Sequence, residues 1–433
     1  MKKTILILNT VFLILFVLPG CDKPELVPEG EESCAGGLSI LSVDDSEIPD
    51  DIRDLIYQPN EGSDFINTTH PDYNASGKTV IIPFSLTDLP WNTAISADVI
   101  EASYFRVLNG SFSDYFRENS YGQFFLNNAG ISDVVSLPYS YADWVALDNP
   151  VIFTTAMNLS SINWDELDEN GDNIISPNEA QIVFIYPFGG SGAVRTYSLD
   201  IVTNYGSFTV NNNFALIDVK RNDDPEKDVN PIIYNSAAVH ELCHAFFNLP
   251  DRYGIDGICG EGETGPYDLM SASCNWVSMT AFDKMKIGWL QPKILEIATL
   301  RESGVRECLT FPASESIPAA LVLWSSEMPE EFFIVENKNS ASGNFGFENL
   351  PENGLAIWWS PMVGNNLHLV NFKKLDLNPQ DQTYYDYSGP GVLFSYNMDY
   401  TALDIIPLRN SDGIARFFFR AISVPGENMY GEL

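Results

Sequence analysis

Basic residues and histidine are scarce in this chain. Its 433 residues include 23 Lys and Arg against 59 Asp and Glu, a formal net charge of −36. The four histidines are His70, His240, His244 and His368. Nucleic-acid binders need a basic surface that displaces counterions, and anionic membranes attract basic segments. We therefore expect no nucleic-acid partner, and any pattern of histidines stands out against a low background.

The apolar run at the start of the chain is short. The mostly apolar run over residues 5–18 follows two lysines and is too short to span a bilayer comfortably. We expect a signal peptide over residues 1–20. The run ends in Leu18-Pro19-Gly20-Cys21, which resembles a bacterial lipobox and predicts cleavage before Cys21 and lipidation of that cysteine. The predicted product is an exported, membrane-anchored lipoprotein of the cell envelope or cell surface. Later release from the membrane is the other possible fate. Ordinary secretion with cleavage nearby is the alternative.

The rest of the composition is that of a folded protein, with 45% hydrophobic and 12% aromatic residues. Residues 21–77 are rich in acids, Pro, Gly and Ser and predict an acidic tether. Apolar runs at residues 79–84 and 181–186 predict buried strands of an α+β domain over residues 78–292. Short alternating strands after Pro292 predict a β-rich domain over residues 293–433. Helices are expected near residues 111–118, 236–247 and 280–287.

The strongest motif is His240-Glu241-Leu242-Cys243-His244. Two histidines four residues apart lie on one helix face, so both rings can reach one Zn²⁺. Glu241 is then placed to take a proton from a water that the metal activates. The alternative is a helix with two histidines that are satisfied by ordinary hydrogen bonds. Cys243, inside the motif, is expected to be a small buried hydrophobic residue, with zinc ligation as the less favoured alternative.

A zinc site needs a third protein ligand, and Asp251 follows closely. The helix must break and reverse to bring this carboxylate to the metal. Asn248 favours a left-handed turn, and Pro250 prevents helix continuation. Asp251 would otherwise only cap the next segment. The other candidates for the third ligand are Asp256, Glu261, Glu263 and His368.

These motifs resemble the immune inhibitor A family of secreted metallopeptidases, within the metzincin clan. The resemblance extends from about residue 78 to about residue 360 and rests on residues 115–122, 240–253, 268–271, 288–292 and 332–337. It implies a zinc endopeptidase with a twisted sheet, an active-site helix and a Met-turn. His240, His244 and Asp251 correspond to the metal ligands, Glu241 to the general base and Met270 to the Met-turn residue.

The chain departs from the family pattern at three places. Asn248 stands where the family usually has Gly, and one extra residue precedes Asp251. Ser360 follows Trp359 where the family commonly shows His. The longer turn bears on the assignment of the third ligand more than on the predicted peptidase activity.

Residues 168–179 match the twelve-residue EF-hand loop that binds Ca²⁺. Asn173 replaces the usual Gly and tolerates the left-handed conformation best among other residues. The alternative is a solvated acidic turn. The expected calcium ligands are Asp168, Asn170, Asp172, the Ile174 carbonyl, Ser176 and Glu179.

The sequence thus predicts an exported zinc endopeptidase that hydrolyses peptide bonds of a protein or peptide substrate, with Ca²⁺ in a structural role. One alternative is a catalytically inactive metal-binding lipoprotein that binds protein or glycan. Another is a zinc hydrolase that acts on a different acyl bond. Asp283 and Lys286, on the helix expected near residues 280–287, are predicted to form a surface pair.

Overall fold

The computed structural model describes residues 38–57, 77–108, 110–147, 149–187, 192–218, 236–253, 264–271, 276–296, 307–314, 317–326, 328–339, 350, 353–362, 367–374, 400–408 and 415–424. The predicted signal peptide, Cys21 and three alternative ligands (Asp256, Glu261 and Glu263) lie outside these residues. His368 is described by its backbone only. Within the described ranges, no helix is both long enough and apolar enough to cross a membrane.

The first sheet is largely parallel and follows the order β3-β2-β6-β8-β5, with β4 beside β2 and β7 beside β8. Only the β7–β8 pairing is antiparallel. The strands expected from residues 79–84 and 181–186 are confirmed. Their apolar runs are nearly continuous because strands of a parallel sheet are buried on both faces. Its strands are β2 (Gly77–Ser85), β3 (Leu126–Ile131), β4 (Val135–Ser136), β5 (Ile174–Ile175), β6 (Gln181–Tyr186), β7 (Ala193–Thr203) and β8 (Gly206–Asp218).

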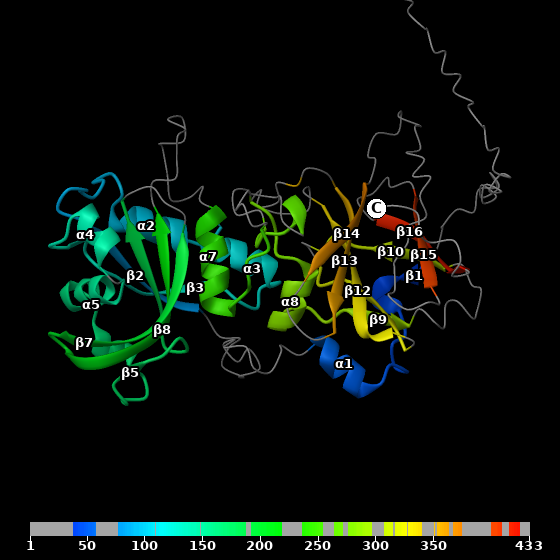
Figure 1. Cartoon of the computed structure of the whole chain (residues 1–433), viewed down its shortest axis with the longest axis horizontal. Helices are drawn as coiled ribbons and strands as arrows, with labels where there is room; N and C mark the ends of the chain where they lie inside the picture. Colours follow the sequence, from blue (N-terminus) through cyan, green and yellow to red (C-terminus); the bar gives the residue numbers. More distant parts are fainter. Residues whose placement is uncertain are drawn as a thin grey trace, which may run out of the picture. The chain divides into compact units, whose positions relative to one another are not determined.

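Helices cover both faces of this sheet. They are α2 (Ala97–Tyr104), α3 (Phe112–Asn119), α4 (Tyr141–Ala146), α5 (Asn149–Leu159), α6 (Trp164–Leu167) and α7 (Ser236–Phe247). On one face Val183 and Ile185 join an apolar cluster with residues of α2, α3 and α7. On the other face Ile182 and Phe184 pack with residues of α5 and α6. Figure 1 shows α7 lying along the sheet beside β8, which places the histidine motif on this scaffold.

The predicted helices form where their end signals place them. Ser111 caps α3 in a reciprocal capping box with Asp114, and Thr280 caps α8 (Ala281–Ile287). Gly288 ends α8 in the left-handed conformation with φ of 88°. Helix α7 has the bounds expected from the sequence.

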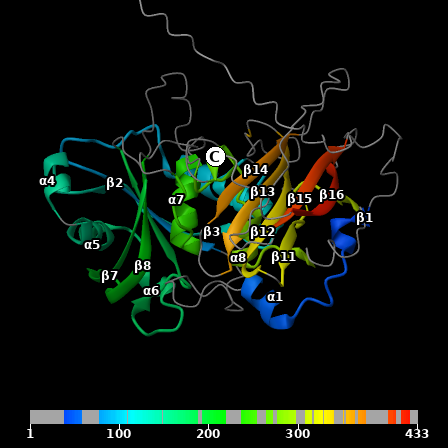
Figure 2. The same cartoon turned by 45° about the vertical axis from the view of Figure 1, so that its right-hand side comes forward.

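Beyond α8, every described regular element is a strand. A mixed sheet has the order β14-β13-β12-β11-β9, in which only β9 and β11 are parallel. Figure 2 shows β12 and β13 side by side, as their antiparallel register requires. A third sheet has the order β1-β10-β16-β15. The strands are β1 (Leu38–Ser39), β9 (Lys293–Glu296), β10 (Glu307–Phe311), β11 (Leu321–Ser325), β12 (Met328–Lys338), β13 (Gly354–Pro361), β14 (His368–Lys374), β15 (Tyr400–Leu408) and β16 (Ala415–Val424).

The α+β class predicted from the sequence is confirmed, with a largely parallel sheet and a second, mixed sheet. The division into domains at residue 292 stays a prediction. A tether over residues 21–77 is wrong for residues 38–57, which form β1, the 3₁₀ helix η1 (Ile40–Ser42) and α1 (Asp50–Tyr57). Ile40 and Ile56 are fully buried there, and the Tyr57 hydroxyl donates a 2.9 Å hydrogen bond to the Pro292 carbonyl. The prediction failed because it rested on the acidic composition of the segment, in which the few apolar residues that become buried do not stand out.

Candidate metal centre

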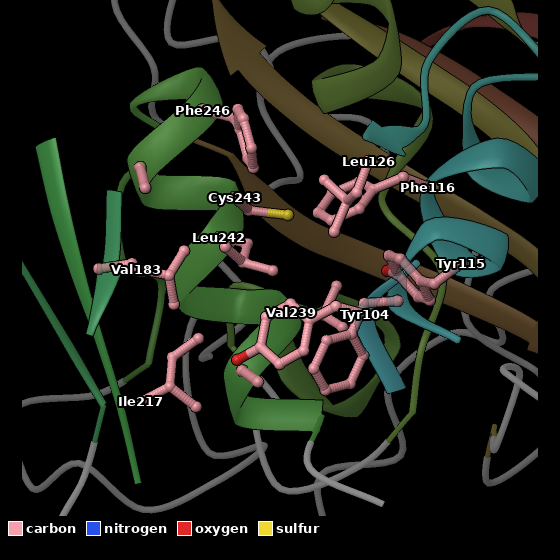
Figure 3. Close-up of a cluster of buried hydrophobic side chains, with 14 of the residues drawn as sticks. Tyr104, Tyr115, Phe116, Leu126, Val183, Ile217, Val239, Leu242, Cys243 and Phe246 are labelled. Atoms are coloured by element: carbon pink, nitrogen blue, oxygen red, sulfur yellow. The ribbon is translucent and has the colours of Figure 1, made fainter. Parts of the chain in front are cut away.

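The candidate centre is built on helix α7, whose apolar side chains face the sheet and the helices α2 and α3. Figure 3 shows Val239, Leu242 and Cys243 within the apolar cluster, with Cys243 directed towards Phe116 and Leu126. Burial raises the pKa of the Cys243 thiol well above its ordinary value. Cys243 is therefore a buried apolar residue, as expected, and not a thiolate ligand.

The turn after α7 carries the extra residue and still brings Asp251 back to the helix. Asn248 adopts the left-handed conformation with φ of 50°, as its residue type predicted. Its backbone N–H donates to the His244 carbonyl at 2.9 Å. One residue beyond Asp251, the N–H of Arg252 donates to the Met270 carbonyl at 2.9 Å. These backbone bonds close the longer turn around Asp251.

Three potential ligand atoms converge at this point. The Nε2 atoms of His240 and His244 are 3.0 Å apart, and each lies 3.0 Å from Oδ1 of Asp251. Atoms bound to one tetrahedral Zn²⁺ at about 2.0–2.1 Å lie about 3.3 Å from one another. Among the residues that the structure describes, this is the one group of His, Cys, Asp and Glu side chains that converges in this way.

The hydrogen bonds behind the two rings test whether the group fits a metal. Nδ1 of His240 donates to the Leu269 carbonyl at 3.1 Å, and Nδ1 of His244 donates to the Leu249 carbonyl. A carbonyl can only accept, so each ring carries a proton on Nδ1 and, when neutral, a lone pair on Nε2. Two lone pairs and a carboxylate then face one another, an arrangement that calls for a cation. The donor set therefore fits Zn²⁺.

Without a metal, a proton on a ring can supply part of that positive charge. Burial lowers the pKa of His244, but the hydrogen bond and the charge of Asp251 outweigh it, and the net pKa is raised. Burial raises the pKa of the Asp251 carboxyl, but its hydrogen bonds to His240 and His244 lower that pKa by more, so it lies well below its ordinary value. The group thus keeps its carboxylate ionised. The ring of Tyr253 stacks near that of His240 and its hydroxyl bonds Asp251.

Glu241 lies beside this cluster but is nearly buried, with 7% of its surface exposed. Burial raises the pKa of its carboxyl, and the neighbouring His240 and His244 partly offset that rise. A carboxylate with a raised pKa is better suited to accept and return a proton near neutral pH. The backbone of Gly192, just before β7, lies directly against this side chain.

The turn predicted to carry the Met-turn residue lies behind His240. Met270 is fully buried in the same apolar cluster as Leu242 and Cys243, and its N–H donates to Oδ1 of Asp268 at 3.0 Å. The Leu269 carbonyl orients the His240 ring. The 3₁₀ helix η4 (Gly265–Tyr267) leads into this turn. The turn therefore supports the His240–His244–Asp251 cluster through both an apolar floor and a backbone carbonyl.

A buried charged network, which sequence reasoning missed, links this turn to the loop that carries Asp251. The guanidinium of Arg252 donates to Oδ2 of Asp268 at 3.0 Å and to Oδ2 of Asp283 at 2.8 Å. Asp268 and Asp283 are fully buried. The predicted surface pair of Asp283 and Lys286 is therefore wrong, because Asp283 pairs with Arg252 and Lys286 is itself buried. The adjacency of Arg252 to Asp251 was the signal available in the sequence.

The predicted calcium loop folds back on its first acid. Oxygens of Asp168 accept from the N–H groups of Gly171, Asp172 and Asn173, at 2.8–3.1 Å. Asn173 has φ of 62°, so it takes the left-handed position expected for it. Ile175 is fully buried on β5, and pairs with β8.

The last predicted calcium ligand is held in a similar way. Oε2 of Glu179 accepts from the backbone and the hydroxyl of Ser176, both at 2.9 Å, while its buried Oε1 has no hydrogen-bond partner within the described structure. An unpartnered carboxylate oxygen is an available oxygen ligand for a hard cation. Calcium binding by Asp168, Asn170, Asp172, Ile174, Ser176 and Glu179 stays a prediction that this geometry fits.

Known proteins add no further assignment to these sites. A scan against models of protein families finds none that matches this chain, and a search of the curated proteins finds no matching relative.

Proposed function

We propose that this chain is an exported, zinc-dependent endopeptidase with a metzincin-like catalytic region, similar to the immune inhibitor A family. The observation that supports the proposal is the convergence of His240, His244 and Asp251 on one point, beside Glu241 on the same helix. A helix with two histidines satisfied by ordinary hydrogen bonds would not need a third ligand atom placed equally close to both rings.

His240, His244 and Asp251 would hold the metal, and the Leu269 and Leu249 carbonyls fix the ring tautomers that this requires. Zn²⁺ supplies a Lewis acid that polarises a carbonyl and makes water a nucleophile near neutral pH. Glu241 accepts the proton of the attacking water and returns it to the leaving amine. Its burial favours this exchange, because the carboxyl has a raised pKa.

The edge of the first sheet supports a peptide substrate over another acyl compound. Within the described residues, β7 pairs with β8 only, so its other edge offers unpaired backbone groups. This edge starts next to Gly192, which touches Glu241. An extended peptide that adds to such an edge brings its own backbone carbonyl to the catalytic group.

The proposal includes Ca²⁺ in the loop over residues 168–179, where it would hold β5 against β8. It also includes export directed by the signal peptide and a lipid anchor on Cys21. The anchor would hold the enzyme at the cell envelope or cell surface, from which it could later be released.

The direct test is cleavage of an unfolded protein, such as reduced casein, by the purified chain with zinc and calcium supplied. The Glu241→Ala variant is the matched control, since it removes the proposed base and keeps all three ligands. Cleavage by the parent and none by the variant supports the peptidase. Equal inactivity of both proteins, each with one zinc bound, would contradict it and favour the metal-binding lipoprotein that binds protein or glycan.

Asp251→Ala separates a ligand from a bystander. We expect the variant to lose zinc and activity together, measured by metal analysis after dialysis. Preserved zinc content would remove Asp251 from the ligand set. Hydrolysis of ester or amide substrates without any cleavage of peptides would instead identify an acyl hydrolase of another kind.

A further inference from the structure

The residue before strand β7 lies unusually close to the proposed base. A methyl group placed on the Cα of Gly192 would lie 2.3 Å from Cγ of Glu241, 2.6 Å from Oε1 and 2.7 Å from Cδ. Cβ atoms in folded proteins essentially never lie within 3.0 Å of a non-bonded heavy atom. All three of these nearest atoms belong to Glu241, so this side chain is the one that limits the space at Gly192 most closely.

The backbone at Gly192 does not itself require glycine. Its φ lies outside the left-handed region, unlike Gly110 and Gly171, whose φ is 73° and whose Cα faces open space. An L-residue could adopt the conformation of Gly192 without strain. The requirement for glycine at this position is therefore a requirement for room next to Glu241.

Neither partner of this contact has an easy way to move. Glu241 is 7% exposed and stands on α7, whose apolar face is buried in the cluster that contains Val239 and Leu242. Strand β7 begins at the next residue and is paired with β8 over its whole length, from Ala193 opposite Leu216 to Thr203 opposite Gly206. The helix and the strand thus hold the contact from both sides.

We propose that Gly192 is a positioning residue for Glu241: its missing side chain lets the start of β7 lie on the carboxylate and confine it beside the His240–His244–Asp251 cluster. The inference rests on the proposed function, because it takes Glu241 as the general base. It adds that one contact fixes both the proposed base and the start of β7, whose second edge has no partner strand among the described residues. A substrate strand on that edge and the proton acceptor would then be positioned by the same contact.

Thermal unfolding tests the contact without relying on activity. Gly192→Ala is compared with the parent, and again in the Glu241→Ala background, where the crowding atoms are gone. We expect Gly192→Ala to lower the melting temperature of the parent and to have little effect in the Glu241→Ala protein. An equal loss of melting temperature in both backgrounds would overturn the proposal.

Gly77→Ala is the matched control. A methyl group at Gly77 would lie 2.6 Å from Cζ of Phe124, a clash of similar size at the start of another strand. This substitution should cost the same melting temperature with and without Glu241. The full-length protein is used throughout, with zinc content measured for every variant.

Peptide hydrolysis then tests the positioning role. Gly192→Ala should keep its zinc and lower kcat by about tenfold or more, with a smaller change in KM, because a displaced base affects the chemical step. Gly77→Ala should keep kcat below its melting temperature. Unchanged kcat in Gly192→Ala would overturn the positioning role. An active Glu241→Ala protein would instead contradict the proposed function, while the melting comparison would still report on the contact.

Discussion

Helices α7 and α8 both connect to the candidate metal centre, and both bury apolar side chains, but within the described structure only α8 adds buried charged groups among its anchors. Helix α7 presents Val239, Leu242 and Cys243 to an apolar cluster. Helix α8 also buries apolar side chains, Phe282 and Met285 among them, but polar groups hold it in addition. Asp283 pairs with Arg252, and the N–H of Ala281 donates to Glu336 at 3.1 Å. Apolar contacts are non-directional and hold a helix in place, whereas charged hydrogen bonds fix the orientation of particular groups.

The polar side extends into the mixed sheet. Glu336 is fully buried and also accepts from the indole N–H of Trp358 at 2.7 Å and from the Ser314 hydroxyl at 2.9 Å. Lys338, equally buried, donates to the carbonyl and the hydroxyl of Ser278. The difference teaches that helix α7, which carries His240 and His244, is secured by packing, while the loop that carries Asp251 is secured by charge.

The largest expected effect comes from Arg252→Leu, which leaves Asp268 and Asp283 buried without their cation. Removal of one partner from a buried ion pair typically costs about 3–5 kcal/mol, and we expect that loss in the free energy of unfolding, measured with urea. Zinc affinity should fall as well, because Arg252 adjoins Asp251. Arg252→Lys, which keeps the charge but not the two-pronged geometry, should lose less. A free energy of unfolding equal to that of the parent would remove the distinction between the two helices.

Lys286 should make stability on the α8 side depend on pH. Burial lowers its pKa to about 8, against about 10.4 in an unfolded chain. Between these values the unfolded chain binds a proton that the folded protein does not, so stability should rise as the pH rises from about 8 to about 10.4. Below pH 8 both states are protonated and the cost of burying the charge is fully present.

The size of that rise is at most about 3 kcal/mol, since one pKa unit corresponds to about 1.4 kcal/mol. The bond from Nζ to the Ile56 carbonyl at 3.2 Å and the nearby ring of Phe282 favour the charged form and reduce it. Urea unfolding at pH 8 and pH 10 measures the effect. Lys286→Met should flatten this part of the profile, and an unaltered profile would exclude Lys286 as its source.

Val239→Ala tests the apolar side. Deleting two buried methyl groups should lower the free energy of unfolding by about 2 kcal/mol. Zinc content and affinity should stay as in the parent, because the packing of α7 is non-directional. Loss of zinc from this variant at temperatures where it remains folded would show that packing also orients the ligands.

The smallest expected effect concerns the calcium loop. At a tenfold excess over the dissociation constant, bound Ca²⁺ should stabilise the protein by about 1.4 kcal/mol, seen as a higher melting temperature. Glu179→Gln should abolish this rise. Glu169→Gln removes the same charge from a loop position that is not a predicted ligand and should keep it. An equal response in all three proteins would place the ion elsewhere.

Much of the fold could be predicted from local signals. The run over residues 181–186 is buried on both faces, Ser111 forms its capping box, and Asn248 takes the left-handed turn that the helix end required. Each outcome depends on residues within a few positions of one another. The cluster of His240, His244 and Asp251 could be predicted for the same reason, since the first and last of these residues are only eleven positions apart.

The polar anchors could not be predicted in this way. Asp283 and Lys286 are spaced like an exposed helix pair, but their partners are Arg252 and the Ile56 carbonyl, which lie 31 and 230 positions away. A single sequence does not indicate which of two such distant polar groups will come into contact. The same holds for Tyr57, whose bond to Pro292 removes residues 38–57 from the predicted tether.

Strand β1 has a consequence for the order in which the protein can fold. Leu38 pairs in parallel with Leu309 on β10, and β10 pairs in turn with β16 near the end of the chain. Ile40, which follows β1, is fully buried in a cluster with Leu309 and Phe311. The pairing of β1 therefore has to wait until β10, about 270 residues later in the chain, has been synthesised. Closing the loop between Leu38 and Leu309 is slow because the two residues are far apart in the sequence. Until it closes, the side chain of Ile40 cannot be buried against Leu309 and Phe311.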